Sequence, residues 1–307
     1  MRRQGYGGRA GPRILRGSMS DLYEFHEHPD LESPVLVLAL DGWIDAGGAA
    51  ARAGASLLDG HETTTVATFD ADTLLDHRAR RPIMHIEDGV NTSLTWPRVE
   101  LVALSDANGN DVVVLTGAEP DHRWKAVSHA VVDLALALGV RLTVGLGAYP
   151  AAVPHTRPSL LATTATEREL VDRVAGVRTT VDVPAGLHAA IERRCAEVGL
   201  PAIGLWAQVP HYASGMPYPA AALSLVETLN DLGDLAFATG SLSEESATTR
   251  ARLDQLVADS AEHVALLRQL EEQIDQRTAP DGDGSEVDLP SGDELAGEIE
   301  RFLRGQE

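Results

Sequence analysis

The stretch that decides the fold runs from Pro34 to Leu58 and has three parts. It opens with a wholly apolar run, Val-Leu-Val-Leu-Ala-Leu at 35–40. A polar, glycine-rich break, Asp-Gly-Trp-Ile-Asp-Ala-Gly-Gly at 41–48, leads into an alanine-rich segment at 49–58. A short apolar run bounded by turn residues predicts a strand buried on both faces, and alanine favours a helix packed closely on it. Strand, turn and helix form half of a βαβ unit, so we expect a ligand site to begin at Asp41.

Composition limits the partners that this chain can have. Its 307 residues can bury a sizeable core, and its net charge of −21 makes nucleic acid and anionic membranes unlikely partners. We therefore expect no nucleic acid and no membrane among its partners. The single cysteine, Cys195, excludes an intramolecular disulfide and fits a reducing, cytoplasmic location. No apolar run approaches the roughly 18–20 residues of a transmembrane helix.

Several catalytic signatures are missing from the sequence. Lys125 is the only lysine beside 24 arginines, and it lies outside the Gly-Lys-Ser/Thr context of a phosphate-binding loop. There is no Gly-x-Ser-x-Gly elbow, no Gly-x-Gly-x-x-Gly after a strand, and no histidine pair with a typical zinc spacing. We therefore expect no cofactor and no metal. Cys195 falls in a segment that predicts a packed helix, which makes it a poor nucleophile.

Changes in composition divide the chain into five segments. Residues 1–18 carry five arginines and no acid, which predicts a disordered basic leader, with Met19 as an alternative start to Met1. Residues 19–240 alternate apolar strands with helices and predict the core domain. Residues 241–277 predict one long amphipathic helix that begins with capping-box spacing. The Gly/Asp/Pro-rich segment 278–291 predicts a flexible acidic linker, and 292–307 predicts a C-terminal helix.

Four buried strands of the predicted core end in polar turns. If the sheet is largely parallel, all four turns lie along its carboxyl edge, which is the default ligand crevice of open α/β sheets. The candidate pocket residues in these turns are Asp41, Trp43, Asp45, Glu119, Asp121, His155, Arg157 and His211. Such a set can bind an anion through arginine, hold a metal through the histidines and an acid, or perform acid–base chemistry.

Each candidate also has a structural explanation. Asp41 and Asp45 can cap the helix that follows them, and Glu119 and Asp121 can cap the next helix. The two histidines can bond to backbone carbonyls within their turns, and Arg157 can form an ion pair with Glu119 or Asp121. The four tryptophans, at 43, 96, 124 and 206, are more typical of a core than of a ligand-stacking site.

Five motifs in order carry a family resemblance. They are Asp41-Gly42-Trp43-x-Asp45-Ala46-Gly47, Arg80-Arg81-Pro82, Gly117-x-Glu119-Pro120-Asp121-x-x-Trp124, Pro154-His155-Thr156-Arg157-Pro158 preceded by Gly147, and Trp206-x-x-Val209-Pro210-His211-Tyr212. With these motifs the chain resembles the proteasome assembly chaperone family in its prokaryotic, actinobacterial form, over residues 22–237. The resemblance implies a three-layer α/β/α domain with a largely parallel sheet, similar to purine nucleoside phosphorylases and related hydrolases, followed here by a helical appendage.

The resemblance also implies self-association, as trimers or larger rings, and possible partners among proteasome subunits. Two departures stand out. The chain ends Arg304-Gly305-Gln306-Glu307 in place of a hydrophobic-Tyr-any tail, and residues 182–187 replace a Gly-Pro-Thr-Gly turn. The main hypothesis is a non-enzymatic assembly-chaperone-like or protein-interaction protein. The alternative is a small-molecule-binding protein or a hydrolase- or phosphorylase-like enzyme with its site at the carboxyl edge of the sheet.

Overall fold

The structure, a computed structural model, describes residues 21–277. The strands of this part are β1 (Tyr23–Phe25), β2 (Val35–Asp41), β3 (Thr64–Phe69), β4 (Ile83–Glu87), β5 (Val90–Thr95), β6 (Val99–Ser105), β7 (Asp111–Ala118), β8 (Leu142–Ala151), β9 (Leu161–Ala165) and β10 (Ala202–Pro210). Its helices are α1 (Ala49–Leu58), α2 (Ala71–Leu74), α3 (Trp124–Ala137), α4 (Arg168–Asp172), α5 (Leu187–Val198), α6 (Pro219–Gly233), α7 (Gly240–Ala258) and α8 (Ala261–Arg277), with 3-10 turns η1 (Ala46–Gly48) and η2 (His211–Ala213).

One large sheet organises the fold, with the strand order β1-β3-β6-β7-β2-β8-β10-β9. Its central strands β7, β2, β8 and β10 run parallel, and the outer strands pair antiparallel. The predicted largely parallel sheet is therefore confirmed. The Asn-Gly turn at 108–109 joins β6 to β7, and Gly109 takes the positive φ of +84° that such a turn requires.

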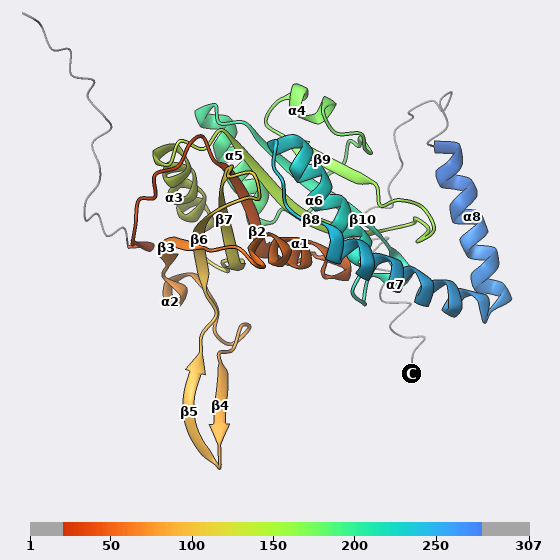
Figure 1. Cartoon of the computed structure of the whole chain (residues 1–307), viewed down its shortest axis with the longest axis horizontal. Helices are drawn as coiled ribbons and strands as arrows, with labels where there is room; N and C mark the ends of the chain where they lie inside the picture. Colours follow the sequence, from red (N-terminus) through yellow and green to blue (C-terminus); the bar gives the residue numbers. More distant parts are fainter. Residues whose placement is uncertain (1–20, 278–307) are drawn as a thin grey trace, which may run out of the picture.

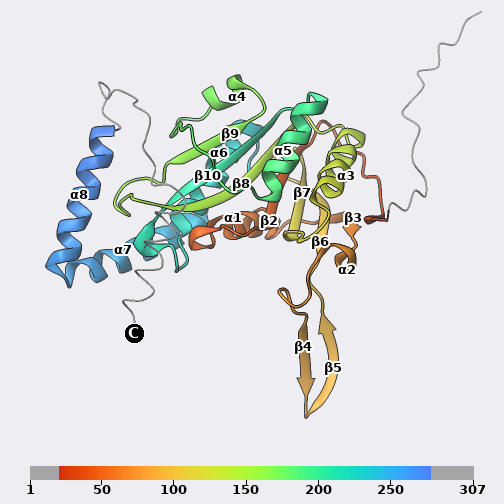
Figure 2. The ribbon, with the colours of Figure 1, turned by 180° about the vertical axis from the view of Figure 1, so that it is seen from behind.

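Helices cover both faces of this sheet, which makes the three layers seen in Figures 1 and 2. On β2, Val35 and Val37 belong to the core beneath α1 and α6, whereas Leu36 and Leu38 belong to the core beneath α3 and α5. Burial on both faces explains why this strand is a continuous apolar run. Helix α1 packs so closely on the sheet that a Cβ on Gly54 would lie 2.7 Å from the Cβ of Ala39, so only small residues fit there.

Strands β4 and β5 form a separate two-stranded sheet that projects from the body (Figures 1 and 2). Every residue of both strands is exposed. We call residues 83–96 the apolar arm, because its exposed side chains include Ile83, Met84, Ile86, Val90, Leu94 and Trp96. A two-stranded hairpin is marginally stable in water by itself, so this ribbon lacks the packing that usually stabilises a sheet.

The C-terminal part differs from the expectation. The single helix predicted over 241–277 is two helices, α7 and α8, separated at Asp259 and Ser260. The reason is local, because the Ser260 hydroxyl accepts a hydrogen bond from the His263 N–H at 3.4 Å and so starts a new helix. The predicted leader, linker and final helix lie outside the described residues. Among residues 21–277, no helix is both long and apolar enough to cross a membrane.

Candidate site at the carboxyl edge of the sheet

The four polar turns follow β7, β2, β8 and β10, which are the four parallel strands at the centre of the sheet. They therefore lie along one edge, with Asp41 at the end of β2, Glu119 beyond β7, His155 beyond β8 and His211 beyond β10. The candidate residues form two groups on this edge. Across the described residues, no hydrogen bond or ion pair joins the β7–β2 group to the β8–β10 group.

Glu119 is the most buried acid of the first group, with 5% of its surface exposed. Its Oε1 accepts a hydrogen bond of 2.6 Å from the backbone N–H of Leu187, the first residue of α5. The carboxylate thus caps α5 and lies at the positive end of that helix dipole. The sequence analysis expected Glu119 to cap the next helix in the chain, which is α3. That expectation is wrong, because Glu119 caps α5. A Cβ on Gly186 would lie 3.2 Å from Oε1, so this position favours glycine.

The two aspartates beside β2 differ in their contacts. Asp45 accepts hydrogen bonds from the backbone N–H groups of Ala50 at 2.8 Å and Ala51 at 2.9 Å, and so caps α1. Asp41, the last residue of β2, makes no such cap. Partial burial raises the pKa of the Asp41 carboxyl, the nearby Asp45 carboxylate raises it further, and Arg80 opposes both effects. The Asp41 carboxyl therefore binds a proton more readily than an ordinary aspartate.

Asp121 connects the core to the root of the apolar arm. Its Oδ2 accepts a 2.8 Å hydrogen bond from the Asp76 N–H, and its Oδ1 pairs with Arg80. Burial favours a higher pKa for Asp121, but the Asp76 N–H and the Arg80 guanidinium lower it below its ordinary value. The carboxylate is thus bound on both oxygens. The nearby Trp124 donates its indole N–H to the Pro120 carbonyl at 2.5 Å, which accounts for the spacing of that motif.

Two tryptophans contradict the expectation of a core position. Trp43 is 58% exposed at the carboxyl edge, because it follows β2 out of the sheet. Trp96, the last residue of the apolar arm, is also exposed. Its ring contacts the His77 ring edge-on, with 5.0 Å between the ring centroids. Trp124 and Trp206 are partly buried. The Trp206 ring lies over Gly147, where a Cβ would approach it to 2.4 Å.

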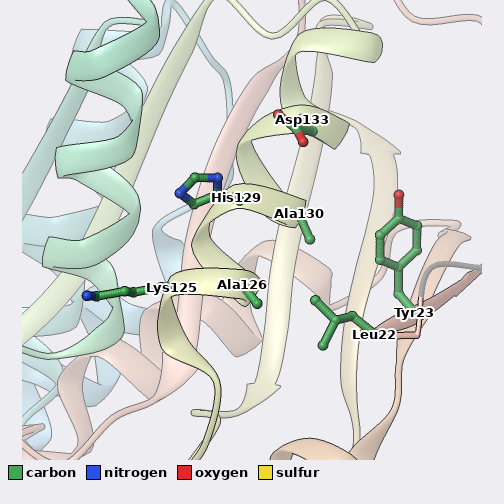
Figure 3. A pocket seen from close by; sticks show the side chains of 7 residues that line it. All are labelled: Leu22, Tyr23, Lys125, Ala126, His129, Ala130 and Asp133. Atoms are coloured by element: carbon green, nitrogen blue, oxygen red, sulfur yellow. The ribbon is translucent and has the colours of Figure 1, made fainter.

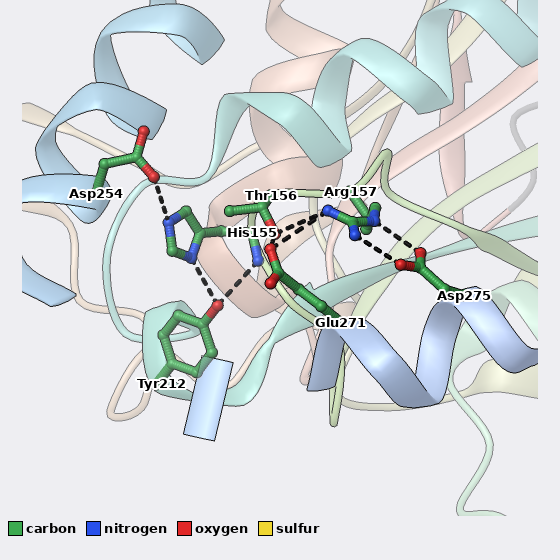
Figure 4. A network of polar contacts seen from close by, with 7 residues as sticks. All are labelled: His155, Thr156, Arg157, Tyr212, Asp254, Glu271 and Asp275. Carbon is green, nitrogen blue, oxygen red and sulfur yellow. Dashed lines mark hydrogen bonds and ion pairs between the residues drawn. The ribbon is translucent and has the colours of Figure 1, made fainter. Parts of the chain in front are cut away.

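The second group begins with a buried histidine (Figure 4). The His155 imidazole is fully buried between two partners, with Nδ1 at 2.7 Å from the Tyr212 Oη and Nε2 at 3.1 Å from the Asp254 Oδ1. Tyr212 Oη also accepts the His155 backbone N–H at 2.9 Å. A carboxylate oxygen accepts hydrogen bonds, so Nε2 is the donor to Asp254 on α7, and Nδ1 shares a hydrogen bond with the tyrosine hydroxyl. Burial raises the pKa of Tyr212 to about 12, so it remains a neutral donor.

The next two residues bind α8 (Figure 4). The Thr156 hydroxyl donates to Glu271 Oε1 at 2.5 Å. Arg157 makes a two-pronged pair with Asp275, at 2.8 Å through Nε and 2.7 Å through Nη2, and contacts Glu271 at 3.3 Å. These bonds hold the pKa of Arg157 above its ordinary value and that of Asp275 below it. The expected pairing of Arg157 with Glu119 or Asp121 is therefore wrong.

His211 does not join His155 in a ligand pair. It is exposed on η2, its ring meets Tyr212 at 5.3 Å, and its carbonyl accepts the Ser214 hydroxyl at 2.8 Å. In the described part of the chain, no group of three histidine, cysteine, aspartate or glutamate side chains is placed to hold a metal ion. Sequence reasoning missed Asp254, Glu271 and Asp275. The only signal for them was the excess of acids over arginines in residues 241–277.

Two pockets lie away from the candidate residues. A pocket of about 470 Å³ lies between β1 and α3, where Tyr23, Lys125, His129 and Asp133 line it (Figure 3). A second, of about 310 Å³, lies between η1 and η2 beside Arg52. Neither is lined by any of the eight candidate residues. Arg52 itself pairs with Glu245 at 2.5 Å, which ties α1 to α7.

Fold and site together define a three-layer α/β/α protein with a parallel core sheet, whose carboxyl edge is contacted by its own C-terminal helices. The chain belongs to the PAC2 family, whose model matches residues 39–257. A search of curated proteins found no match.

Three solved structures from actinobacteria resemble this one. A protein of unknown function from Corynebacterium glutamicum is 32% identical, with a TM-score of 0.80, over 84% of this chain and 98% of that one. A second protein of unknown function, from Mycobacterium tuberculosis, is 38% identical, with a TM-score of 0.78, over 86% and 94% of the two chains. A proteasome-assembly chaperone homologue from the same organism is 28% identical, with a TM-score of 0.71, over 77% and 99%.

Proposed function

We propose that this chain is a non-enzymatic protein-interaction protein of the assembly-chaperone type, which self-associates and acts on proteasome subunits in the cytoplasm. Membership of the PAC2 family and similarity to a proteasome-assembly chaperone homologue support this proposal. The observation that carries it is the apolar arm, which projects from the body with its hydrophobic side chains exposed.

The arm is suited to burial against protein. Large exposed apolar surfaces on soluble proteins mark interaction sites, and the arm exposes six large apolar side chains within 14 residues. Complete burial of one large aliphatic side chain contributes about 1.5–3 kcal/mol. Ile83, Ile86, Val90 and Leu94 are 42–63% exposed, so burying what remains of them contributes roughly 3–7 kcal/mol, which lies at the low end of the 4–15 kcal/mol that association costs. We propose a trimer or larger homo-oligomer in which each subunit buries its arm.

The catalytic alternative receives less support. Asp45 and Glu119 cap helices, Asp121 fastens the arm, and Arg157 binds α8. Asp45 and Asp121 are bonded on both carboxylate oxygens and Arg157 on all three nitrogens, which leaves these side chains little capacity to bind substrate. We therefore do not propose an enzymatic function from these residues.

Light scattering after size exclusion tests self-association, with Ile86→Ser/Val90→Ser as the arm variant. Leu136→Ser, an exposed apolar residue on α3, is the matched control. We expect a multimer for the unchanged chain and the control, and a monomer with an unchanged circular dichroism spectrum for the arm variant. A multimer that survives the arm substitution would refute the assigned role of the arm.

Affinity capture of the tagged full chain from its native cytosol tests the partner. We expect proteasome subunits in a fixed ratio to the chain, measured by quantitative mass spectrometry. Recovery of a bound metabolite without proteasome subunits would contradict the proposal and return attention to Asp41 and Trp43.

A further inference from the structure

Three consecutive residues after β8 each contact a carboxylate of the C-terminal helices. His155 contacts Asp254 on α7, while Thr156 and Arg157 contact Glu271 and Asp275 on α8 (Figure 4). The last two residues lie beside an apolar spot made by Ala151, Val153 and Leu160. We call Thr156, Arg157 and this apolar spot the ledge.

The ledge recognises a defined pattern on a helix. Ile274 of α8 packs on Ala151 and Val153, and it lies between the two bound carboxylates in the sequence Glu271-x-x-Ile274-Asp275. Positions separated by three and four residues share one face of a helix. The ledge therefore binds an acidic residue, an aliphatic residue three positions later and an acid at the fourth. A small anion has neither the aliphatic group nor the second carboxylate.

Few contacts hold α8 in place. Among residues 261–276, whose burial the structure describes, only Leu270 and Ile274 are buried. The Asp275 side chain is about half exposed and Arg157 is a third exposed, and ion pairs at such positions add little to stability. One guanidinium also serves two carboxylates, so repulsion between Glu271 and Asp275 opposes docking. A helix held by so few buried groups opens locally at small cost.

We propose that the ledge is a docking site for an acidic amphipathic helix of a partner protein, and that α8 occupies it in cis as an internal competitor. Charge complementarity to Arg157 and the apolar spot define the partner helix by its acid-x-x-aliphatic-acid spacing. Helix-in-groove recognition uses the same spacing of anchors. The inference rests on the proposed function as an interaction protein, and it specifies the chemistry of one partner.

The probe is a fluorescent peptide with the sequence of residues 261–277, titrated with purified full-length chain at about 0.15 M salt, where long-range repulsion is screened. The chain is used unchanged and as Glu271→Gln/Ile274→Ser/Asp275→Asn, in which its own α8 is disabled. We expect the disabled chain to bind the peptide at least tenfold more tightly by anisotropy, because the internal competitor is lost. A peptide carrying the same three substitutions is expected to lose this affinity.

Arg157→Ala in the disabled chain tests the ledge itself, and Arg168→Ala is the matched control, since Arg168 forms an ion pair with Asp172 on distant α4. We expect Arg157→Ala to weaken peptide binding about tenfold and the control to leave it unchanged, with circular dichroism confirming the fold of both. Equal affinity with and without Arg157 would overturn the proposal. Exchange of α8 between chains, seen as a new dimer of the unchanged protein, would also overturn it, because the occupant would then be a second copy.

The test is independent of the proteasome and of the apolar arm. A chain that fails to capture proteasome subunits but binds the peptide through Arg157 would refute the proposed function and keep the docking site. The reverse result would remove the docking site alone.

Discussion

Replacing Glu119 tests whether the candidate carboxylates serve the fold or a ligand. Glu119→Ala removes the acceptor of the Leu187 N–H, and Leu187 is completely buried. An unsatisfied buried donor costs about 1–3 kcal/mol, and loss of a negative charge at the positive end of α5 costs about 0.3–1 kcal/mol more. The sum predicts a loss of about 1.5–4 kcal/mol in the free energy of unfolding. At about 2 °C per kcal/mol for a large domain, the melting temperature falls by roughly 3–8 °C.

The assay is thermal unfolding at fixed protein concentration, combined with hydrogen exchange at the first turn of α5. Glu119→Gln keeps an acceptor but loses the charge, so we expect a smaller loss than for alanine. Glu62→Ala, which removes an exposed acid, is the control and should change stability by no more than about 0.5 kcal/mol. A Glu119→Ala chain with unchanged melting temperature and unchanged exchange in α5 would refute the capping role and reopen a ligand-binding role.

Three further predictions concern single residues elsewhere in the fold. Burial raises the pKa of Asp106, but hydrogen bonds from Asn110, Ala236 and Asn108 outweigh it and hold the pKa below its ordinary value. The ionised carboxylate therefore stabilises the fold at any pH above the ordinary carboxyl pKa of about 4. Its contribution is lost as pH falls from the ordinary carboxyl pKa through the lower folded-state pKa, so Asp106→Asn should destabilise at pH 7 by an amount that shrinks as pH falls below about 4 in urea titrations. Gly117→Ala should cost more than about 1–3 kcal/mol by chemical denaturation, because φ is +101° and a Cβ would lie 2.0 Å from the Arg98 carbonyl. Trp43→Ser should leave the free energy of unfolding within about 0.5 kcal/mol of the original, since the indole is largely exposed.

The parallel core was accessible from the sequence because its strands are buried on both faces. The runs at 35–40 and 111–115 carry no polar residue after the first position, and each ends in a turn with acids nearby. Parallel pairing then places those turns on one edge without further information. The β6–β7 hairpin was also predictable from local sequence, since the Asn-Gly pair determines its turn.

The contacts of the candidate residues were not accessible in the same way. Arg157 and Asp275 are 118 positions apart, and their pairing depends on the path of α7 and α8 over the edge. The break between these helices depends on one serine, whose hydroxyl competes with an amphipathic pattern that otherwise continues. Local propensity favours strands in the apolar arm, but it does not show whether a strand packs on the body or projects from it.

Most of the residues that carry the family resemblance attach a helix or the arm to the core sheet. Asp45 fixes α1, Glu119 fixes α5, and Asp121 with Arg80 fixes the root of the arm, while Arg157 fixes α8. An α/β sheet commonly uses its carboxyl edge to assemble a ligand site from turns. Here the same turns attach two elements to the core, the arm through Asp121 beyond β7 and α8 through the ledge beyond β8. A core of this design can present one surface for self-association and another for a partner helix. The polar side chains of this edge then serve to position helices and the arm.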